Sequence, residues 1–306
     1  KGELVFADGE SGKVCFDITD EEKIDFEKQV EQAKAFKQHL LSYKDVETKT
    51  KDGKRVLLCG NIMSTEMCSD ITSINGDGSG LFRTEFLYME RKDLPSEDEQ
   101  FLIYKNVAEK FGDKPVIIRT FDIGGDKKVE CLDLPVEENP FLGYRALRIC
   151  LDSVDLFETQ INAILRASVF GNLYIMFPMV TNISEIKQSK AILKSCMKKL
   201  DEQAIAYDKN IKIGIMVEVP SIAVVADKAI KEVDFFSIGT NDLVQYTLAV
   251  DRGSEKMAYL YQPAHPAILS LIKHVSDVAR THNIWVGVCG EMAGDPLYTA
   301  LLVGMG

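Results

Sequence analysis

The sequence predicts an α/β protein built on a parallel sheet or a barrel. The chain has 306 residues, of which 46% are hydrophobic, enough for one barrel of about 250 residues and a small appendage. From residue 56 onward, short apolar runs alternate with stretches of helical spacing, which is typical of βα repeats. Several of these runs end at a charged or nucleophilic side chain, the position where α/β barrels carry their chemistry.

The expected strands are seven apolar runs, at residues 56–59, 80–82, 116–118, 173–177, 211–217, 235–238 and 285–288. Helix-like stretches separate them, and two of these begin with a capping box, Ser96 with Glu99 and Asn182 with Glu185. The last expected helix ends near Gly306, where an eighth strand would begin. The barrel is therefore expected to be truncated before its eighth strand.

The N-terminal part predicts a different organisation. Within residues 1–18, two short apolar runs around turn glycines give a hairpin-like signal. Thr19 and Glu22 fit the capping box of a helix in which Phe26 and Leu40 keep helical spacing, while lysine and glutamate fill the other face. Such a helix either packs on the surface of the next domain or connects two domains.

Charge and cysteine usage limit the class of protein. The net charge of −11 argues against nucleic-acid binding, so a local basic cluster must attract any anionic substrate. The seven cysteines form no Cys-x-x-Cys pair, which is typical of a reducing cytosol. No signal peptide and no apolar stretch of about 18 residues appear, so we expect a cytoplasmic protein without a membrane span.

Four arginines are candidate anion ligands. Arg83 and Arg119 directly follow expected strands, and Arg145 and Arg252 stand near glycines. The guanidinium fork binds phosphate and carboxylate bidentately, so these residues suit a substrate that carries both groups. The alternative for any single arginine is a surface ion pair.

Two carboxylates and one thiol also follow expected strands. Glu218 and Asp242 could hold Mg²⁺ at the rim of the sheet, or they could cap helices or be buried, hydrogen-bonded acids. Cys289 could donate a proton, although a lone cysteine is usually a small core residue. Lys127, in Gly-Gly-Asp-Lys, could line a phosphate site.

Taken together, these segments resemble Enzyme I of the phosphoenolpyruvate-dependent sugar phosphotransferase system. The stretches that carry the resemblance lie at residues 80–89, 119–127, 138–148, 175–180, 214–220, 235–243, 246–253 and 289–295, and among them are Gly-Leu-Phe-Arg-Thr-Glu, Arg-Thr-Phe-Asp-Ile-Gly-Gly-Asp-Lys and Cys-Gly-Glu-Met-Ala-Gly-Asp. Their order and spacing agree with the family along the whole chain.

The resemblance implies a TIM-type (β/α)8 barrel that binds phosphoenolpyruvate (PEP) and Mg²⁺ and forms a homodimer. It implies that the substrate is held by Arg83, Arg119, Lys127, Arg145, Asn241, Asp242 and Arg252. Glu218 and Asp242 would ligate Mg²⁺. Cys289 would protonate the enolate carbon to release pyruvate, and three of the arginines, Arg83, Arg119 and Arg145, would assist catalysis.

The chain departs from the family in one respect that matters for turnover. The family's phosphoryl acceptor is a histidine in a Gly-Gly-x-x-Ser-His segment of a preceding domain, and no such segment is present. Residues 1–18 resemble only the last strands of that phosphohistidine domain, residues 19–54 its linker helix and connector, and residues 55–306 an incomplete barrel. We therefore expect an enzyme fragment that needs the histidine domain, and through it the phosphocarrier protein HPr, as partners.

Two other functions remain open from the sequence. A PEP domain like that of the pyruvate phosphate dikinases shares several motifs, but it resembles the chain less around residues 122–127 and 249–253. A non-catalytic module that senses PEP and dimerises would not need Cys289 for phosphoryl transfer.

Overall fold

The computed structural model describes residues 5–9, 11–125 and 129–306, and the chain forms two compact units. The first unit comprises Lys1–Val56 and the second Leu57–Gly306.

The first unit contains a hairpin and a long helix. Strands β1 (Phe6–Asp8) and β2 (Lys13–Cys15) pair antiparallel, as the turn signals predicted. Helix α1 (Asp20–Leu41) begins at a capping box between Thr19 and Glu22, which the sequence also predicted. The ring of Phe26 is buried and stacks on Phe6 with 3.7 Å between centroids, so this aromatic residue of the helix anchors it to the hairpin.

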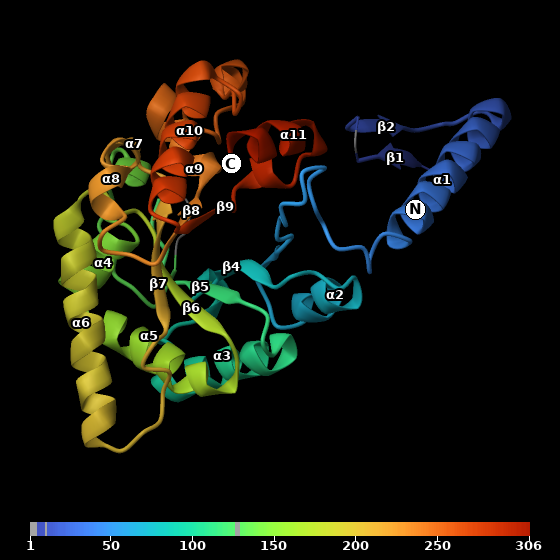
Figure 1. The fold of residues 1–306 in the computed structure, drawn as a ribbon. Helices are drawn as coiled ribbons and strands as arrows, with labels where there is room; N and C mark the ends of the chain where they lie inside the picture. Colours follow the sequence, from blue (N-terminus) through green and yellow to red (C-terminus); the bar gives the residue numbers. More distant parts are fainter. Residues whose placement is uncertain (1–4, 10, 126–128) are drawn as a thin grey trace. The chain divides into compact units, whose positions relative to one another are not determined.

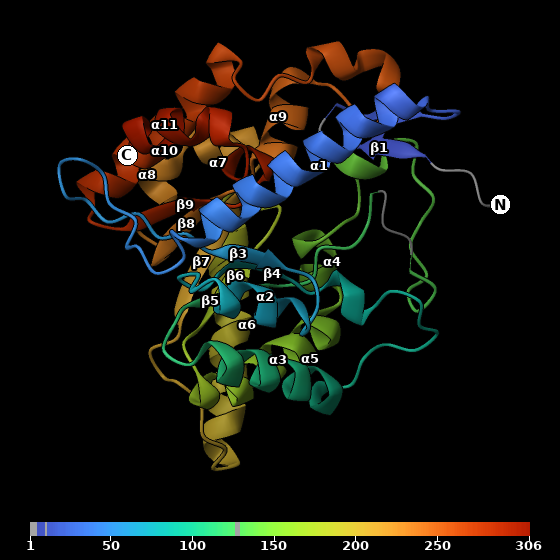
Figure 2. The same cartoon turned by 90° about the vertical axis from the view of Figure 1, so that its right-hand side faces the viewer.

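The second unit is built on seven parallel strands that follow one another in sequence order (Figure 1). They are β3 (Gly60–Ile62), β4 (Ser79–Arg83), β5 (Val116–Arg119), β6 (Leu173–Phe177), β7 (Lys212–Val217), β8 (Phe235–Ile238) and β9 (Trp285–Val288). The sheet curls into part of a barrel, with helices on its outer side (Figures 1 and 2). This confirms the predicted α/β fold of the incomplete TIM-barrel type.

One predicted strand was wrong in position. The apolar run at residues 56–59 does not join the sheet, and β3 begins only at Gly60. Leu57 and Leu58 are more than half exposed, and the backbone of Leu58 instead exchanges hydrogen bonds with Asp77. The hydrophobicity of residues 56–59 predicted a buried strand. In the structure, the backbone of Leu58 bonds to Asp77 in the turn before β4 and not to a strand of the sheet.

The helices that connect the strands form the outer layer. They are α2 (Met67–Ser73), α3 (Glu97–Phe111), α4 (Leu147–Asp152), α5 (Val154–Ala167), α6 (Ile183–Glu202), α7 (Pro220–Val224), α8 (Ala226–Ala229), α9 (Thr240–Leu248), α10 (Pro266–Thr281) and α11 (Pro296–Met305), with short 3₁₀ turns η1 (Glu85–Leu87), η2 (Pro140–Leu142), η3 (Ser168–Phe170), η4 (Glu255–Leu260) and η5 (Glu291–Ala293). Helices α3 and α6 begin at the two predicted capping boxes. None of the described helices is both long and apolar enough to cross a membrane.

The curvature of the sheet creates two apolar cores. The larger core lies between the strands and the helices, and it includes residues such as Phe82, Ile118 and Phe236. A smaller cluster lies on the concave side and consists of Leu81, Ile117, Met176, Met216, Phe235 and Cys289. Strand side chains alternate between the two faces of the sheet. Members of the concave cluster near the carboxyl ends of their strands, such as Leu81 and Met216, therefore form the floor of a pocket.

Candidate functional site

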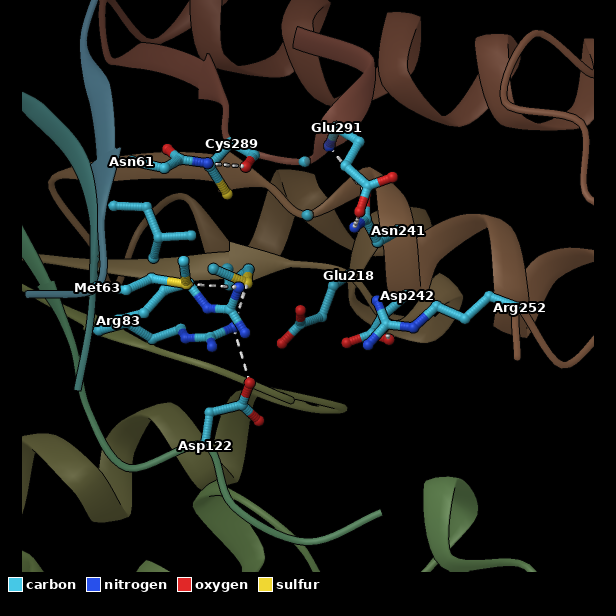
Figure 3. Close-up of a pocket in the computed structure, with 15 residues that line it drawn as sticks. Asn61, Met63, Arg83, Asp122, Glu218, Asn241, Asp242, Arg252, Cys289 and Glu291 are labelled. Atoms are coloured by element: carbon cyan, nitrogen blue, oxygen red, sulfur yellow. Dashed lines mark hydrogen bonds and ion pairs between the residues drawn. The ribbon is translucent and has the colours of Figure 1, made fainter. Parts of the chain in front are cut away.

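A cavity of about 300 Å³ opens at the carboxyl ends of the strands (Figure 3). Of the residues predicted from sequence, those that line it are Arg83, Arg119, Glu218, Asn241, Asp242, Arg252 and Cys289. It is also lined by residues without a predicted role, namely Asn61, Met63, Leu81, Asp122, Met216, Gly239, Gly290 and Glu291. The sheet thus brings together side chains that are up to 230 residues apart in sequence, from Asn61 to Glu291.

The two other predicted residues are Arg145 and Lys127. Arg145 lies outside the cavity, with only 1% of its surface exposed. Lys127 lies outside the described residues.

Arg83 and Arg119 stand side by side because they end neighbouring strands in register. Glu85, two residues after β4, bridges them: its Oε1 pairs with Nη2 of Arg119 and lies 3.5 Å from Nε of Arg83. Glu85 is 4% exposed and Arg119 is 6% exposed, so these charges are held in a nearly dry environment. A buried carboxylate between two guanidinium groups offsets their repulsion and orients both toward the cavity.

Asp122 extends this arrangement to Arg145. Its carboxylate lies 2.7 Å from Nη1 of Arg119 and 3.0 Å from Nη2 of Arg145. Burial alone lowers the pKa of Arg119, but Asp122 and Glu85 outweigh it, and the net result is a raised pKa. Both arginines therefore remain charged at any working pH.

Arg145 then connects to the other side of the site. Its Nη2 lies 3.6 Å from Oδ2 of Asp242, and Oδ1 of Asp242 lies 3.7 Å from Nη1 of Arg252. Nη1 of Arg145 also donates to the hydroxyl of Tyr246 at 3.1 Å. The result is an alternating row of charges, defined as the charge row: Arg83, Glu85, Arg119, Asp122, Arg145, Asp242 and Arg252. Within it, Arg145 lies behind the carboxylates rather than at the cavity surface.

Sequence reasoning missed Glu85 and Asp122. Neither follows a strand directly, and each stands two or three residues after a strand-end arginine, within Arg-Thr-Glu and Arg-Thr-Phe-Asp. The signal that could have identified them is a carboxylate close behind an arginine that must stay buried, since such a cation requires a partner.

Glu218 and Asp242 follow the adjacent strands β7 and β8, and both are buried. Neither is a helix N-cap, because Val219 and Gly239 occupy those positions before α7 and α9. Oε1 of Glu218 accepts a hydrogen bond from the backbone of Met179 at 2.6 Å. Burial, and then the nearby charges of Asp242 and Asp122, raise the pKa of Glu218 to about 8.

These two carboxylates fit a hard divalent cation. Oδ1 of Asp242 is buried and accepts no hydrogen bond from any described residue, so a cation would satisfy it. No group of three or more acidic, histidine or cysteine ligands occurs in the described part of the chain. A Mg²⁺ ion held by one or two carboxylates usually takes its remaining ligands from substrate and water, which matches a two-carboxylate site.

Cys289 lies directly after β9 with 6% of its surface exposed. Burial, partly offset by a hydrogen bond with Ser237, raises the pKa of its thiol to about 11. The group therefore stays protonated near neutral pH and can act as an acid rather than as a thiolate nucleophile. Because Cys289 lines the cavity, its position favours a role as proton donor over the alternative that it only fills the core.

Comparison with known proteins agrees with this geometry. Residues 37–306 match the family described as PEP-utilising enzyme, PEP-binding domain. Over the whole chain, the sequence is 50% identical to the phosphoenolpyruvate-protein phosphotransferase of Geobacillus stearothermophilus, 49% to that of Enterococcus faecalis and 48% to that of Bacillus subtilis. The chain spans about half the length of these relatives, 53% of the first two and 54% of the third.

The family match covers most of the chain, and the relatives are similar from end to end of it. The resemblance drawn from the motifs is therefore confirmed. The chain belongs to the PEP-utilising enzymes and carries their PEP-binding domain.

Proposed function

We propose that this chain binds PEP with Mg²⁺ and donates its phosphoryl group to a histidine of a separate domain, releasing pyruvate. This is the first step of the sugar phosphotransferase system. The observation that carries the proposal is a single cavity lined by two neighbouring guanidinium groups, two buried carboxylates and a protonated thiol. The relatives named phosphoenolpyruvate-protein phosphotransferase support the same reaction.

The arginines of the site bind the anion. Arg83 and Arg119 hold the phosphoryl group, and Lys127 contributes to binding the same group. Arg252 and Asn241 contact the carboxylate side of PEP. Arg145 acts from behind, where it keeps Asp122 and Asp242 in place. Removing one donor that stabilises charge in a transition state typically lowers the rate about a hundredfold or more.

Glu218 and Asp242 would hold Mg²⁺, which would supply positive charge that stabilises the enolate. The bond between phosphorus and the enol oxygen breaks while a nitrogen–phosphorus bond forms at the acceptor histidine. The electron pair of the broken bond leaves an enolate. Cys289 then gives its proton to the enolate carbon, which yields pyruvate.

The acceptor must come from outside the site. None of the residues that line the cavity is a histidine. A phosphohistidine domain docked over the cavity, and HPr as its own acceptor, are therefore the proposed partners. A homodimer is proposed from the resemblance to Enzyme I alone.

The test is phosphorylation of an added histidine domain of Enzyme I by radiolabelled PEP, with and without Mg²⁺. We expect label on the domain only with Mg²⁺, and a loss of at least about a hundredfold for Arg83→Ala or Arg119→Ala. Arg91→Ala is the matched control, because Arg91 pairs with Glu99 and does not line the cavity.

Two outcomes would contradict the proposal. Unchanged labelling in both site variants would show that Arg83 and Arg119 do not bind the phosphoryl group. Transfer that requires a nucleotide and inorganic phosphate indicates a dikinase-type reaction instead.

A further inference from the structure

The backbone that carries Cys289 has a contact with the opposite end of the sheet. Nδ2 of Asn61, on β3, donates to the carbonyl oxygen of Cys289 at 2.9 Å (Figure 3). β3 and β9 are the first and last strands of the sheet and are not paired with each other. One amide side chain therefore bridges two strands that are 228 residues apart at this point.

This bond adds to the sheet pairing of the strand that leads into Cys289. In the described part of the chain, β9 pairs with β8, from Phe235 opposite Trp285 to Ile238 opposite Val288. The Cys289 amide donates to the carbonyl of Ile238 on the β8 side at 3.0 Å. Asn61 supplies a partner for the carbonyl of the same residue, so the peptide groups on both sides of the Cys289 Cα are each held by a hydrogen bond.

The segment that follows Cys289 is held from the other side of the cavity. Asn241 and Glu291 form a reciprocal pair, in which the Glu291 backbone donates to Oδ1 at 2.9 Å and Nδ2 donates to the Glu291 carboxylate at 3.0 Å. A Cβ on Gly290 would lie 2.0 Å from Oγ1 of Thr240. Residues 290–291 are thus held against α9, and the thiol of Cys289 contacts the carbonyl of Ile238 at 3.6 Å. The Asn61 bond holds the Cys289 carbonyl from the β3 side.

We infer that Asn61 is a positioning residue for proton transfer: its amide holds the Cys289 backbone so that the thiol faces the enolate carbon. Asn61 acts through Cys289 and needs no contact with the substrate. The inference rests on the proposed function, since it gives a role to a residue around the assigned proton donor.

The role of Asn61 depends on the N–H donor of its side-chain amide. An aspartate of the same size would place a carboxylate oxygen against the carbonyl oxygen and repel it. An alanine would leave the carbonyl to water. Both changes act at an exposed side chain, so neither opens a void in the core.

The experiment isolates the proton step from phosphoryl transfer. The 306-residue chain is incubated with pyruvate and Mg²⁺ in D₂O, and deuterium entry into the pyruvate methyl group is followed by NMR. Exchange runs the proton step in reverse and then forward: the thiolate fraction of Cys289 removes a methyl proton to form the enolate, and the thiol, after exchange with D₂O, returns deuterium to the carbon. Asn61→Ala should slow exchange roughly tenfold, the effect of losing about one hydrogen bond, and should leave the pyruvate concentration for half-saturation unchanged. Asn61→Asp should slow it further.

The controls separate positioning from folding. Asn210→Ala, at an exposed position away from the cavity, should exchange at the unaltered rate. Thermal unfolding of the variants should match that of the parent chain. Cys289→Ala should abolish exchange.

The possible failures can be told apart. Exchange at the parent rate in both Asn61 variants, with Cys289→Ala inactive, overturns the inference and leaves the proposed function intact. Exchange that persists in Cys289→Ala, or that is absent in the parent chain, overturns the assigned proton donor and the inference with it. A changed half-saturation without a changed maximal rate would make Asn61 a ligand of the substrate and would also contradict the inference.

Discussion

Arg119 and Asp122 form a buried ion pair just beyond β5, with 2.7 Å between Nη1 and Oδ2. Their side chains are 7% and 2% exposed, so neither charge is solvated by bulk water. The same carboxylate also contacts Arg145. The pair therefore connects a cavity arginine to the buried interior.

Asp122→Asn should destabilise the fold as well as impair the site. Breaking a buried ion pair by removing one partner typically costs about 3–5 kcal/mol, and here two guanidinium groups lose charge compensation. Urea denaturation should show a lower midpoint with an unchanged slope. Asp113→Asn, at an exposed position, is the control, and an equal effect there would contradict the assigned role of Asp122.

Arg119→Lys should not substitute for arginine. Lysine offers one ammonium group, whereas Arg119 pairs with Glu85 and Asp122 through two different nitrogens. We expect PEP affinity, measured by calorimetry with Mg²⁺, to fall at least about tenfold, since a charge-assisted hydrogen bond is worth about 1.5–3 kcal/mol. Affinity within twofold of the parent would show that a point charge is sufficient at this position.

The stability of the metal-free chain should decrease with rising pH because of Glu218. Its folded pKa is raised to about 8 from an ordinary value of 4.5, so between these values the folded state binds the extra proton. This contribution to stability is present below about pH 4.5 and is lost as pH rises through about 8.

Mg²⁺ should counteract this decrease, because it replaces the proton at Glu218. The rise in Tm on adding Mg²⁺ should be larger at pH 8 than at pH 6. Glu218→Gln should remove both the pH slope and the effect of the metal. A Mg²⁺ shift of the same size at both pH values would indicate that the ion does not bind this carboxylate.

Cys289 should react slowly with iodoacetamide near neutral pH, because its raised pKa of about 11 leaves little thiolate. In the proposed reaction, Cys289→Ala should lower the rate of enolate protonation by about 10² to 10⁴, the usual contribution of a general acid. Deuterium entry into pyruvate reports on the same proton transfer, run first in reverse and then forward. Rapid alkylation at pH 7 would instead indicate a thiolate and a different role.

Gly290→Ala should disrupt the cavity, whereas Gly304→Ala should not. A Cβ at Gly290 would lie 2.0 Å from Oγ1 and 2.7 Å from the backbone nitrogen of Thr240, while a Cβ at Gly304 meets nothing within 4 Å. Displacing the start of α9 moves Asp242, so we expect weaker Mg²⁺ and PEP binding. Unaltered binding would show that α9 adjusts without consequence.

The barrel strands illustrate what periodicity can predict. The runs at residues 173–177, 235–238 and 285–288 match β6, β8 and β9, because each is a short apolar run bounded by turns. The run at residues 56–59 failed, since Leu58 pairs with Asp77 outside the sheet and hydrophobicity does not encode that partner.

By itself, the sequence determined the order of strands, the helix caps and the reactive residues at the strand ends. These depend on local spacing and on chemistry within a few residues. The tertiary structure decided which charges meet. Glu85 and Asp122 acquire their roles only when β4 and β5 lie side by side, and Arg145 is placed behind the cavity by a loop 26 residues further along the chain from Arg119. The bond from Asn61 to Cys289 likewise exists only because the sheet curls, bringing its first and last strands close together.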